Sequence, residues 1–159
     1  MTLPIIMNTI DVTIFGMEGT RMYTAAILTE ESAALLKQSV LEKIGTSLDG
    51  FHFQTLAGVP LPHHMTINLG SFDEHLNDPS ILNNSVKLFA RGFLWSEEIG
   101  ACAALVTSAQ IQSSNVFTHI TVCIRPPAKP ADSNRLPRNS KAFIFDPPIE
   151  LDAIVKEEH

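Results

Sequence analysis

Residues 85–107 read SVKLFARGFLWSEEIGACAALVT, and this stretch decides the fold class. Its two halves, SVKLFARGFLW (85–95) and ACAALVT (101–107), are rich in apolar, aromatic and β-branched residues, and the short link SEEIG separates them. Two such runs joined by a short connection predict an antiparallel hairpin. The rest of the chain can be interpreted outward from this hairpin.

Further segments are predicted to be extended because apolar or β-branched residues are bounded by turn residues. They are TIDVTIF (9–15), MYTAAILT (22–29), FHFQT (51–55), HHMTINL (63–69), FTHITVCI (117–124), AFIF (142–145) and IELDAIV (149–155). One helix is predicted over residues 31–44, with Thr29 or Glu30 as its N-cap and Gly45 at its end. Residues 71–84, with one helical turn, and 125–142 are predicted loops. Many strands with few helices predict an α+β fold of mainly antiparallel sheet.

Length and composition predict a single domain over residues 1–159, because 45% of the residues are hydrophobic and can form one core. No segment approaches the roughly 20 apolar residues of a membrane span, and the N-terminus lacks the features of a signal peptide. We therefore expect no membrane association and a cytoplasmic location. Cys102 and Cys123 lie in apolar runs without metal-type or redox-type spacing, so buried reduced thiols are expected.

The charge balance limits the class of partner. With 11 Lys and Arg against 17 Asp and Glu, the net charge is −6, which argues against a protein that wraps long nucleic acid. A small anionic substrate in a local pocket remains compatible with this charge. The basic residues cluster in the Pro-rich loop, where Asp132 is the only acid: Arg125, Lys129, Arg135, Arg138 and Lys141.

Two predicted strands, containing HMTI (64–67) and HITV (119–122), share one pattern. Side chains alternate along a strand, so each His shares a face with the Thr two residues later, while the apolar residues face the other way. With six histidines, about one His-x-Ser/Thr tripeptide is expected by chance, so the tripeptide alone is weak evidence. The shared apolar setting is the stronger signal, although ordinary strand histidines bonded to their neighbours remain the alternative.

These two motifs resemble those of the 2H phosphoesterase superfamily, which is named for two His-x-Ser/Thr motifs. The resemblance extends to the strand and helix before the first motif and to the strand pair between the motifs. It implies a bilobed fold with a central cleft between two lobes. The link at 108–115 is shorter than the helix that larger members carry there. The layout therefore resembles small members, such as phage-type enzymes that cleave cyclic oligonucleotide messengers (anti-CBASS type) and cyclic phosphodiesterase domains of RNA repair.

The resemblance implies a phosphoric diester hydrolase with His64, Thr66, His119 and Thr121 as catalytic residues. One imidazole can take a proton from the attacking oxygen while the other gives one to the leaving oxygen, without a metal or other cofactor. The threonine hydroxyls can donate hydrogen bonds to the phosphate oxygens. The expected substrate is a small nucleotide or short oligonucleotide that carries a 2′,3′-cyclic phosphate or a cyclic linkage.

Other residues are candidates for substrate binding. Tyr23, Trp95 and Phe117 could stack on a base, although packing is the alternative for each. Arg135 and Arg138 in the basic loop could contact further phosphates, unless the loop is only a solvated connection.

Three alternatives to an enzyme of this kind stay open. A metal site could combine His63, His64 and His119 with a carboxylate, but adjacent residues of a strand face opposite ways, which makes His63 a bystander. A module with this fold could bind a cyclic nucleotide or RNA end without cleaving it. The third alternative is a purely structural protein, in which the two histidines have no chemical role.

Overall fold

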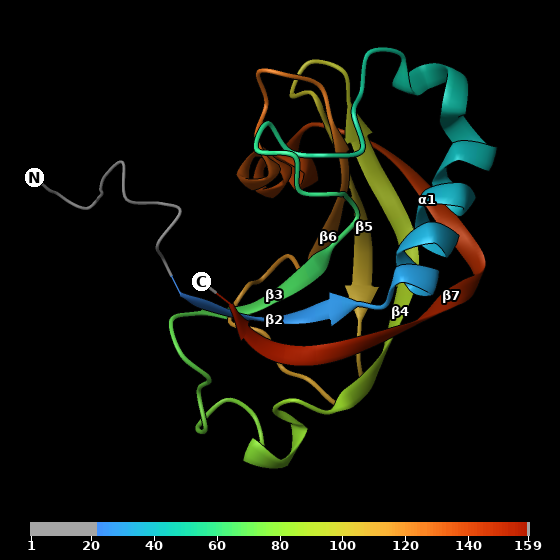
Figure 1. The fold of residues 1–159 in the computed structure, drawn as a ribbon. Helices are drawn as coiled ribbons and strands as arrows, with labels where there is room; N and C mark the ends of the chain where they lie inside the picture. Colours follow the sequence, from blue (N-terminus) through green and yellow to red (C-terminus); the bar gives the residue numbers. More distant parts are fainter. Residues whose placement is uncertain (1–21, 159) are drawn as a thin grey trace, which may run out of the picture.

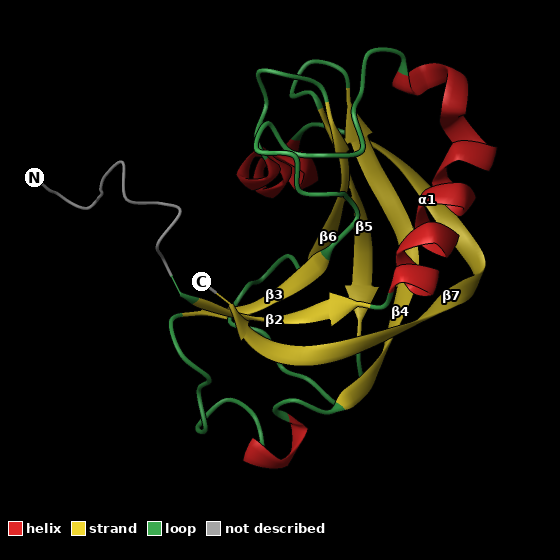
Figure 2. Ribbon diagram, viewed as in Figure 1, coloured by secondary structure: helices red, strands yellow, loops and turns green. Residues whose placement is uncertain are grey.

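The computed structural model describes residues 22–158, so the strand predicted at 9–15 lies outside the described residues. Six antiparallel strands form a closed barrel in the order β2-β3-β6-β5-β4-β7 (Figures 1 and 2). Their bounds are β2 (Tyr23–Leu28), β3 (His64–Leu69), β4 (Ser85–Ser96), β5 (Ala101–Thr107), β6 (His119–Ile124) and β7 (Lys141–Glu158). The predicted hairpin is confirmed, since β4 pairs with β5 from Phe89↔Thr107 to Ser96↔Ala101.

The long strand β7 closes the barrel because it pairs with β4 along one edge and with β2 along the other. Its pairing with β4 is interrupted: Ala90 is opposite Ile149, but Gly92 is opposite Ile144. The two prolines at 147 and 148, which have no N–H to donate to a ladder, lie in this irregularity. Gly92 is required here, since a Cβ at that position would lie 2.2 Å from the Phe143 carbonyl oxygen.

The predicted bilobed α+β fold is wrong. The six strands form one closed sheet rather than two lobes with a cleft between them. The sequence predicts two extended pieces at 142–145 and 149–155, with Pro147 and Pro148 between them. In the structure both pieces belong to β7, which is long enough to reach two different partners.

The helix α1 (Glu30–Ile44) begins and ends close to the predicted positions. Thr29 is its N-cap, since its hydroxyl accepts a hydrogen bond from the Ser32 N–H at 3.2 Å. The chain continues from α1 into the 3₁₀ helix η2 (Gly45–Leu48). The predicted helical turn within 71–84 is η3 (Pro79–Ile81).

Two local predictions are wrong. Residues 51–55 make only isolated bridges, His52↔Ile124 and Gln54↔Pro60, rather than a strand. The basic loop is not irregular throughout, because Pro130–Arg138 forms the 3₁₀ helix η4. Within the described part of the chain, no helix is long and apolar enough to cross a membrane.

Two hydrophobic clusters lie on opposite faces of β5 and β6. The main cluster contains Met65 of β3, Cys102 of β5 and Ile120 of β6, and Leu36 and Val40 of α1 also belong to it. A smaller cluster on the other face holds η4 and the segment before β3 against the sheet; its buried members are Leu61, Ile99, Ala101, Ala103, Ile124, Ala128 and Leu136. Cys102 and Cys123 are free and buried, as expected, and are partners across β5 and β6.

Candidate functional site

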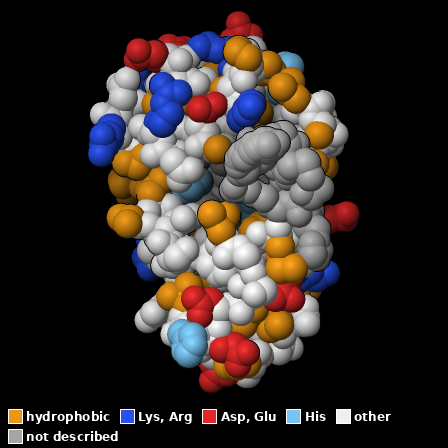
Figure 3. All heavy atoms as spheres, turned by 90° about the vertical axis from the view of Figure 1, so that its left-hand side faces the viewer, with side chains coloured by type: hydrophobic (Ala, Val, Ile, Leu, Met, Phe, Trp, Pro, Cys, Tyr) orange, Lys and Arg blue, Asp and Glu red, His pale blue; other side chains and the backbone are white. Residues whose placement is uncertain are grey.

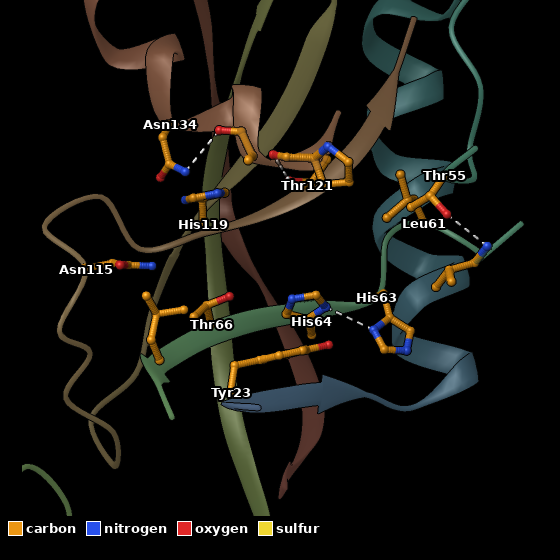
Figure 4. A pocket seen from close by; sticks show the side chains of 14 residues that line it. Tyr23, Thr55, Leu61, His63, His64, Thr66, Asn115, His119, Thr121 and Asn134 are labelled. Carbon is orange, nitrogen blue, oxygen red and sulfur yellow. Dashed lines mark hydrogen bonds between the residues drawn. The ribbon is translucent and has the colours of Figure 1, made fainter. Parts of the chain in front are cut away.

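The two His-x-Thr motifs lie on neighbouring antiparallel strands, β3 and β6, with Met65 opposite Ile120. Both of these residues are buried in the main core, so the flanking His and Thr side chains project from the other face of the sheet. Because the strands run in opposite directions, the His of each motif lies beside the Thr of the other. Figure 4 shows this arrangement, with Thr66 below His119.

These four side chains line a pocket of about 490 Å³, which is within the usual range for small-molecule sites. Histidine is the only residue type among its described lining residues that titrates near neutral pH, and none of them is Lys, Arg, Asp or Glu. The described residues that line the pocket are Tyr23, Thr55, Val59, Leu61, His63, His64, Thr66, Leu69, Asn115, His119, Thr121, Pro130, Ala131 and Asn134. In the space-filling view, histidine side chains are set back in a hollow, and Lys and Arg side chains gather above it (Figure 3).

The walls of the pocket are held by the smaller hydrophobic cluster. Leu136 of η4 is fully buried there with Ala101 and Ala103 of β5, which brings Pro130, Ala131 and Asn134 to the pocket. Leu61 belongs to the same cluster and carries the opposite wall. The small side chains of β5 therefore allow η4 to pack closely on the sheet and shape the site.

His64 lies against two other rings, those of His63 and Tyr23. Its Nδ1 lies 3.0 Å from Nδ1 of His63, and its ring centroid lies 5.1 Å from that of Tyr23. The pKa of His64 is lowered to about 4, mainly because the ring is buried and, to a smaller extent, because positive charge on His63 and then on His119 would repel a proton there. His64 is therefore electrically neutral at neutral pH.

His119 has a different environment. Its Nδ1 lies 2.8 Å from the carbonyl oxygen of Phe117, which can only accept, so Nδ1 carries a proton and donates it. The Phe117 ring stacks on the imidazole with centroids 4.4 Å apart. Burial lowers the pKa of His119, and the Phe117 carbonyl opposes this shift without cancelling it. Neutral His119 therefore has its lone pair on Nε2.

The two threonines also differ. Thr66 is half-buried, and its hydroxyl has no hydrogen-bond partner among residues 22–158. Thr121 is buried, with its hydroxyl 2.9 Å from the Ser133 hydroxyl and 3.3 Å from the Pro130 carbonyl oxygen. Thr121 therefore connects β6 to η4, whereas Thr66 is available to a ligand.

The other predicted binding residues separate into two groups. Tyr23 lines the pocket, and burial, followed by the charge of Glu158, raises the pKa of its phenol. Trp95 instead packs on Phe93, with ring centroids 5.6 Å apart, and Phe117 supports His119.

The two arginines predicted to bind further phosphates are absent from the described lining of the pocket. Arg135 pairs with Asp132 at 3.4 Å on the exposed side of η4, and Arg138, at the end of η4, is also exposed. These two arginines therefore lie outside the described wall of the pocket.

The sequence interpretation missed His63, Leu61, Asn115 and Asn134 as lining residues. His63 was set aside because strand alternation turns it away from His64, but β3 begins at His64, so alternation does not govern His63. The other three are ordinary loop or helix residues that carry no chemical signal in the sequence. Among the described residues, no three His, Cys, Asp or Glu side chains form a group that could hold a metal ion.

In comparisons with known proteins, no protein-family model matches the chain and no curated protein matches it significantly.

Proposed function

We propose that this protein is a phosphodiesterase that acts on a small nucleotide or short oligonucleotide, with His64 and His119 as its acid–base pair. One observation carries the proposal: two motifs far apart in the sequence bring both histidines and both threonines into one pocket. The chemistry of phosphodiester cleavage needs one proton acceptor and one proton donor on the two sides of the phosphorus.

His119 suits the role of base. Its Nδ1 proton is held by the Phe117 carbonyl, so neutral His119 offers Nε2 to the attacking oxygen. That oxygen belongs to water for a 2′,3′-cyclic phosphate, or to the 2′-hydroxyl for a 3′–5′ linkage. His64 then protonates the leaving oxygen, and the Thr66 hydroxyl donates a hydrogen bond to a non-bridging oxygen.

The lining of the pocket favours a substrate with a single phosphodiester. Since no Lys or Arg is among the described lining residues, nothing there compensates the charges of a polyphosphate. Val59, Leu61 and Leu69 offer apolar surface to a base or sugar, and the Asn115 and Asn134 carboxamides offer polar groups at the rim. Free, buried Cys102 and Cys123 are compatible with a cytoplasmic location.

The test is a substrate panel of 2′,3′-cyclic nucleotides, 2′–5′ dinucleotides and cyclic di- and trinucleotides, incubated in EDTA and analysed by product mass. We expect at least one substrate to be cleaved, with activity unchanged by EDTA and lost in His64→Ala and His119→Ala. Activity that EDTA abolishes would contradict the metal-independent mechanism. Binding of a labelled nucleotide without product after long incubation would instead indicate a non-catalytic module.

A further inference from the structure

The proposed acid, His64, presents a difficulty that the proposed base does not. An acid must hold a proton before it donates one, but the pKa of His64 is lowered to about 4, so its ring is neutral at neutral pH. A neutral imidazole that loses its only N–H proton becomes an anion, which is unfavourable. His64 therefore needs a second source of protons to act as an acid.

His63, the residue before His64 in the sequence, lies where it can supply that proton. His63 precedes β3, and its carbonyl oxygen accepts a hydrogen bond from the Leu28 N–H at 2.9 Å, which fixes its backbone at the end of β2. Its ring turns toward His64, edge to face at 84°, with the two Nδ1 atoms 3.0 Å apart (Figure 4). Both rings line the pocket.

This contact limits how many protons the two rings can hold. One Nδ1 must donate and the other must accept, because two Nδ1–H groups at 3.0 Å would repel each other. The pair therefore carries at most one positive charge while the contact persists. When His63 is the charged ring, its Nδ1–H points at His64, whose own proton must then be on Nε2.

We propose that His63 is a positioning residue that donates its Nδ1 proton to His64, holds the His64 proton on Nε2 toward the pocket, and replaces that proton once it has been transferred. This inference rests on the proposed function. In the step, the His64 Nε2–H bond breaks as a bond to the leaving oxygen forms. The His63 Nδ1–H bond breaks as a His64 Nδ1–H bond forms, and the positive charge of His63 disappears.

The other groups around His64 do not compete for this role. Tyr23 on β2 faces the ring, and its phenol stays protonated because burial and then Glu158 on β7 raise its pKa. Among the described residues that line the pocket, His119 on β6 is the remaining titratable group, and it donates its Nδ1 proton to the Phe117 carbonyl oxygen. From η4 and residues 55–61, no described residue that lines the pocket is charged.

Two variants of His63 separate a proton donor from a packing residue. His63→Phe keeps a planar ring but has no ring N–H that could be donated. We expect kcat to fall about 10- to 100-fold, the range for losing a partner that orients a histidine. The alkaline limb of the pH profile should move to lower pH. In the wild type the extra proton can be on His63 or on His64, whereas in the variant only His64 can hold it, so the proton is lost at lower pH. His63→Asp should restore much of kcat and move this limb to higher pH, since a carboxylate stabilises charged His64.

Opposite shifts of the alkaline limb would support the proposal. If Phe is tolerated better than Asp and neither variant moves the limb, His63 only packs against His64. Thermal unfolding of both variants checks that the protein remains folded.

A second measurement observes the ring protons directly in the wild-type protein. The ¹⁵N spectra of histidine-labelled wild-type protein report which ring nitrogen is protonated, with signals assigned by comparison with His64→Gln and His119→Gln. At pH values between the acidic and alkaline limbs of the activity profile, we expect the two histidines to be different tautomers, with the proton of His64 on Nε2 and that of His119 on Nδ1. Nδ1–H on His64 throughout would overturn the proposal. Opposite tautomers without turnover of any phosphodiester would retain the histidine pair and reject the proposed function.

Discussion

The two His-x-Thr motifs are nearly identical in sequence, yet the structure places them in different environments. His64 contacts another titratable ring, whereas His119 contacts a backbone carbonyl. The hydroxyl of Thr66 has no partner among the described residues, whereas that of Thr121 is bonded to Ser133 in η4. Neighbours outside each tripeptide therefore determine which ring nitrogen of each histidine holds the proton. A symmetric pair of motifs can therefore supply an asymmetric acid–base pair.

The largest expected effect tests what the motifs share. His64→Ala and His119→Ala should each lower kcat by about 10²- to 10⁴-fold, the usual contribution of a general acid or base. His75→Ala is the matched control, because His75 is exposed and lies in the loop after β3, away from the pocket. Full activity in either motif variant would remove that histidine from the mechanism. The measurement is steady-state turnover on the best substrate of the panel.

A smaller effect separates the two threonines. Thr66→Ala should lower kcat by about 10²-fold, because it removes one hydrogen bond to the phosphate in the transition state. Thr121→Ala should instead lower the free energy of unfolding by about 1–3 kcal/mol, because it leaves the buried Ser133 hydroxyl without this partner. Denaturant unfolding and turnover measure the two effects.

Thr121→Ser is the control for this comparison, since it keeps the hydroxyl at the same position. It should retain most of the wild-type stability. Equal losses of kcat in Thr66→Ala and Thr121→Ala, with stability unchanged in both, would show that the threonines are equivalent after all.

The lowered pKa values of His64 and His119 predict how the free energy of unfolding depends on pH. The pKa of His64 is about 4 in the folded protein and about 6.5 when unfolded, so the unfolded state binds more protons between these values. The stability from keeping His64 neutral is complete above pH 6.5 and is lost as pH falls toward 4. His64→Gln should flatten this dependence by at most about 3.5 kcal/mol, since one pKa unit corresponds to about 1.4 kcal/mol.

His119→Gln provides the comparison for that prediction. The pKa of His119 is also lowered, and its Phe117 contact opposes the shift, so the curve should flatten in the same direction but less. Chemical denaturation at several pH values between 4 and 7 measures both variants. If the pH dependence of stability changed more in His119→Gln than in His64→Gln, His119 rather than His64 would have the more strongly lowered pKa.

The smallest effect is expected outside the pocket. Arg135→Ala and Arg138→Ala should each change kcat/KM by less than about twofold, because neither is among the described residues of the pocket wall. The exposed pair Arg135–Asp132 should contribute at most about 1 kcal/mol to stability. A loss of binding in either variant, measured by KM, would place a second phosphate of the substrate near η4.

Sequence periodicity was sufficient for most local structure. It predicted α1 with either Thr29 or Glu30 as its N-cap, the β4–β5 hairpin and the strands that carry the two motifs, because these depend on neighbours a few residues away. It also selected His64, Thr66, His119 and Thr121, since alternation along a strand determines which residues share a face. The convergence of these four residues on one pocket was an expectation that only the pairing of β3 with β6 could test.

Tertiary structure decided the rest. The closed barrel depends on β7 pairing with two strands distant in sequence, and the prolines within it concealed its continuity. The His63–His64 contact depends on where β3 begins, and the wall at η4 depends on Leu136 packing against β5. Local sequence determines the face on which a side chain lies; long-range packing determines which groups it meets there, and those groups set its proton affinity and hydrogen bonds.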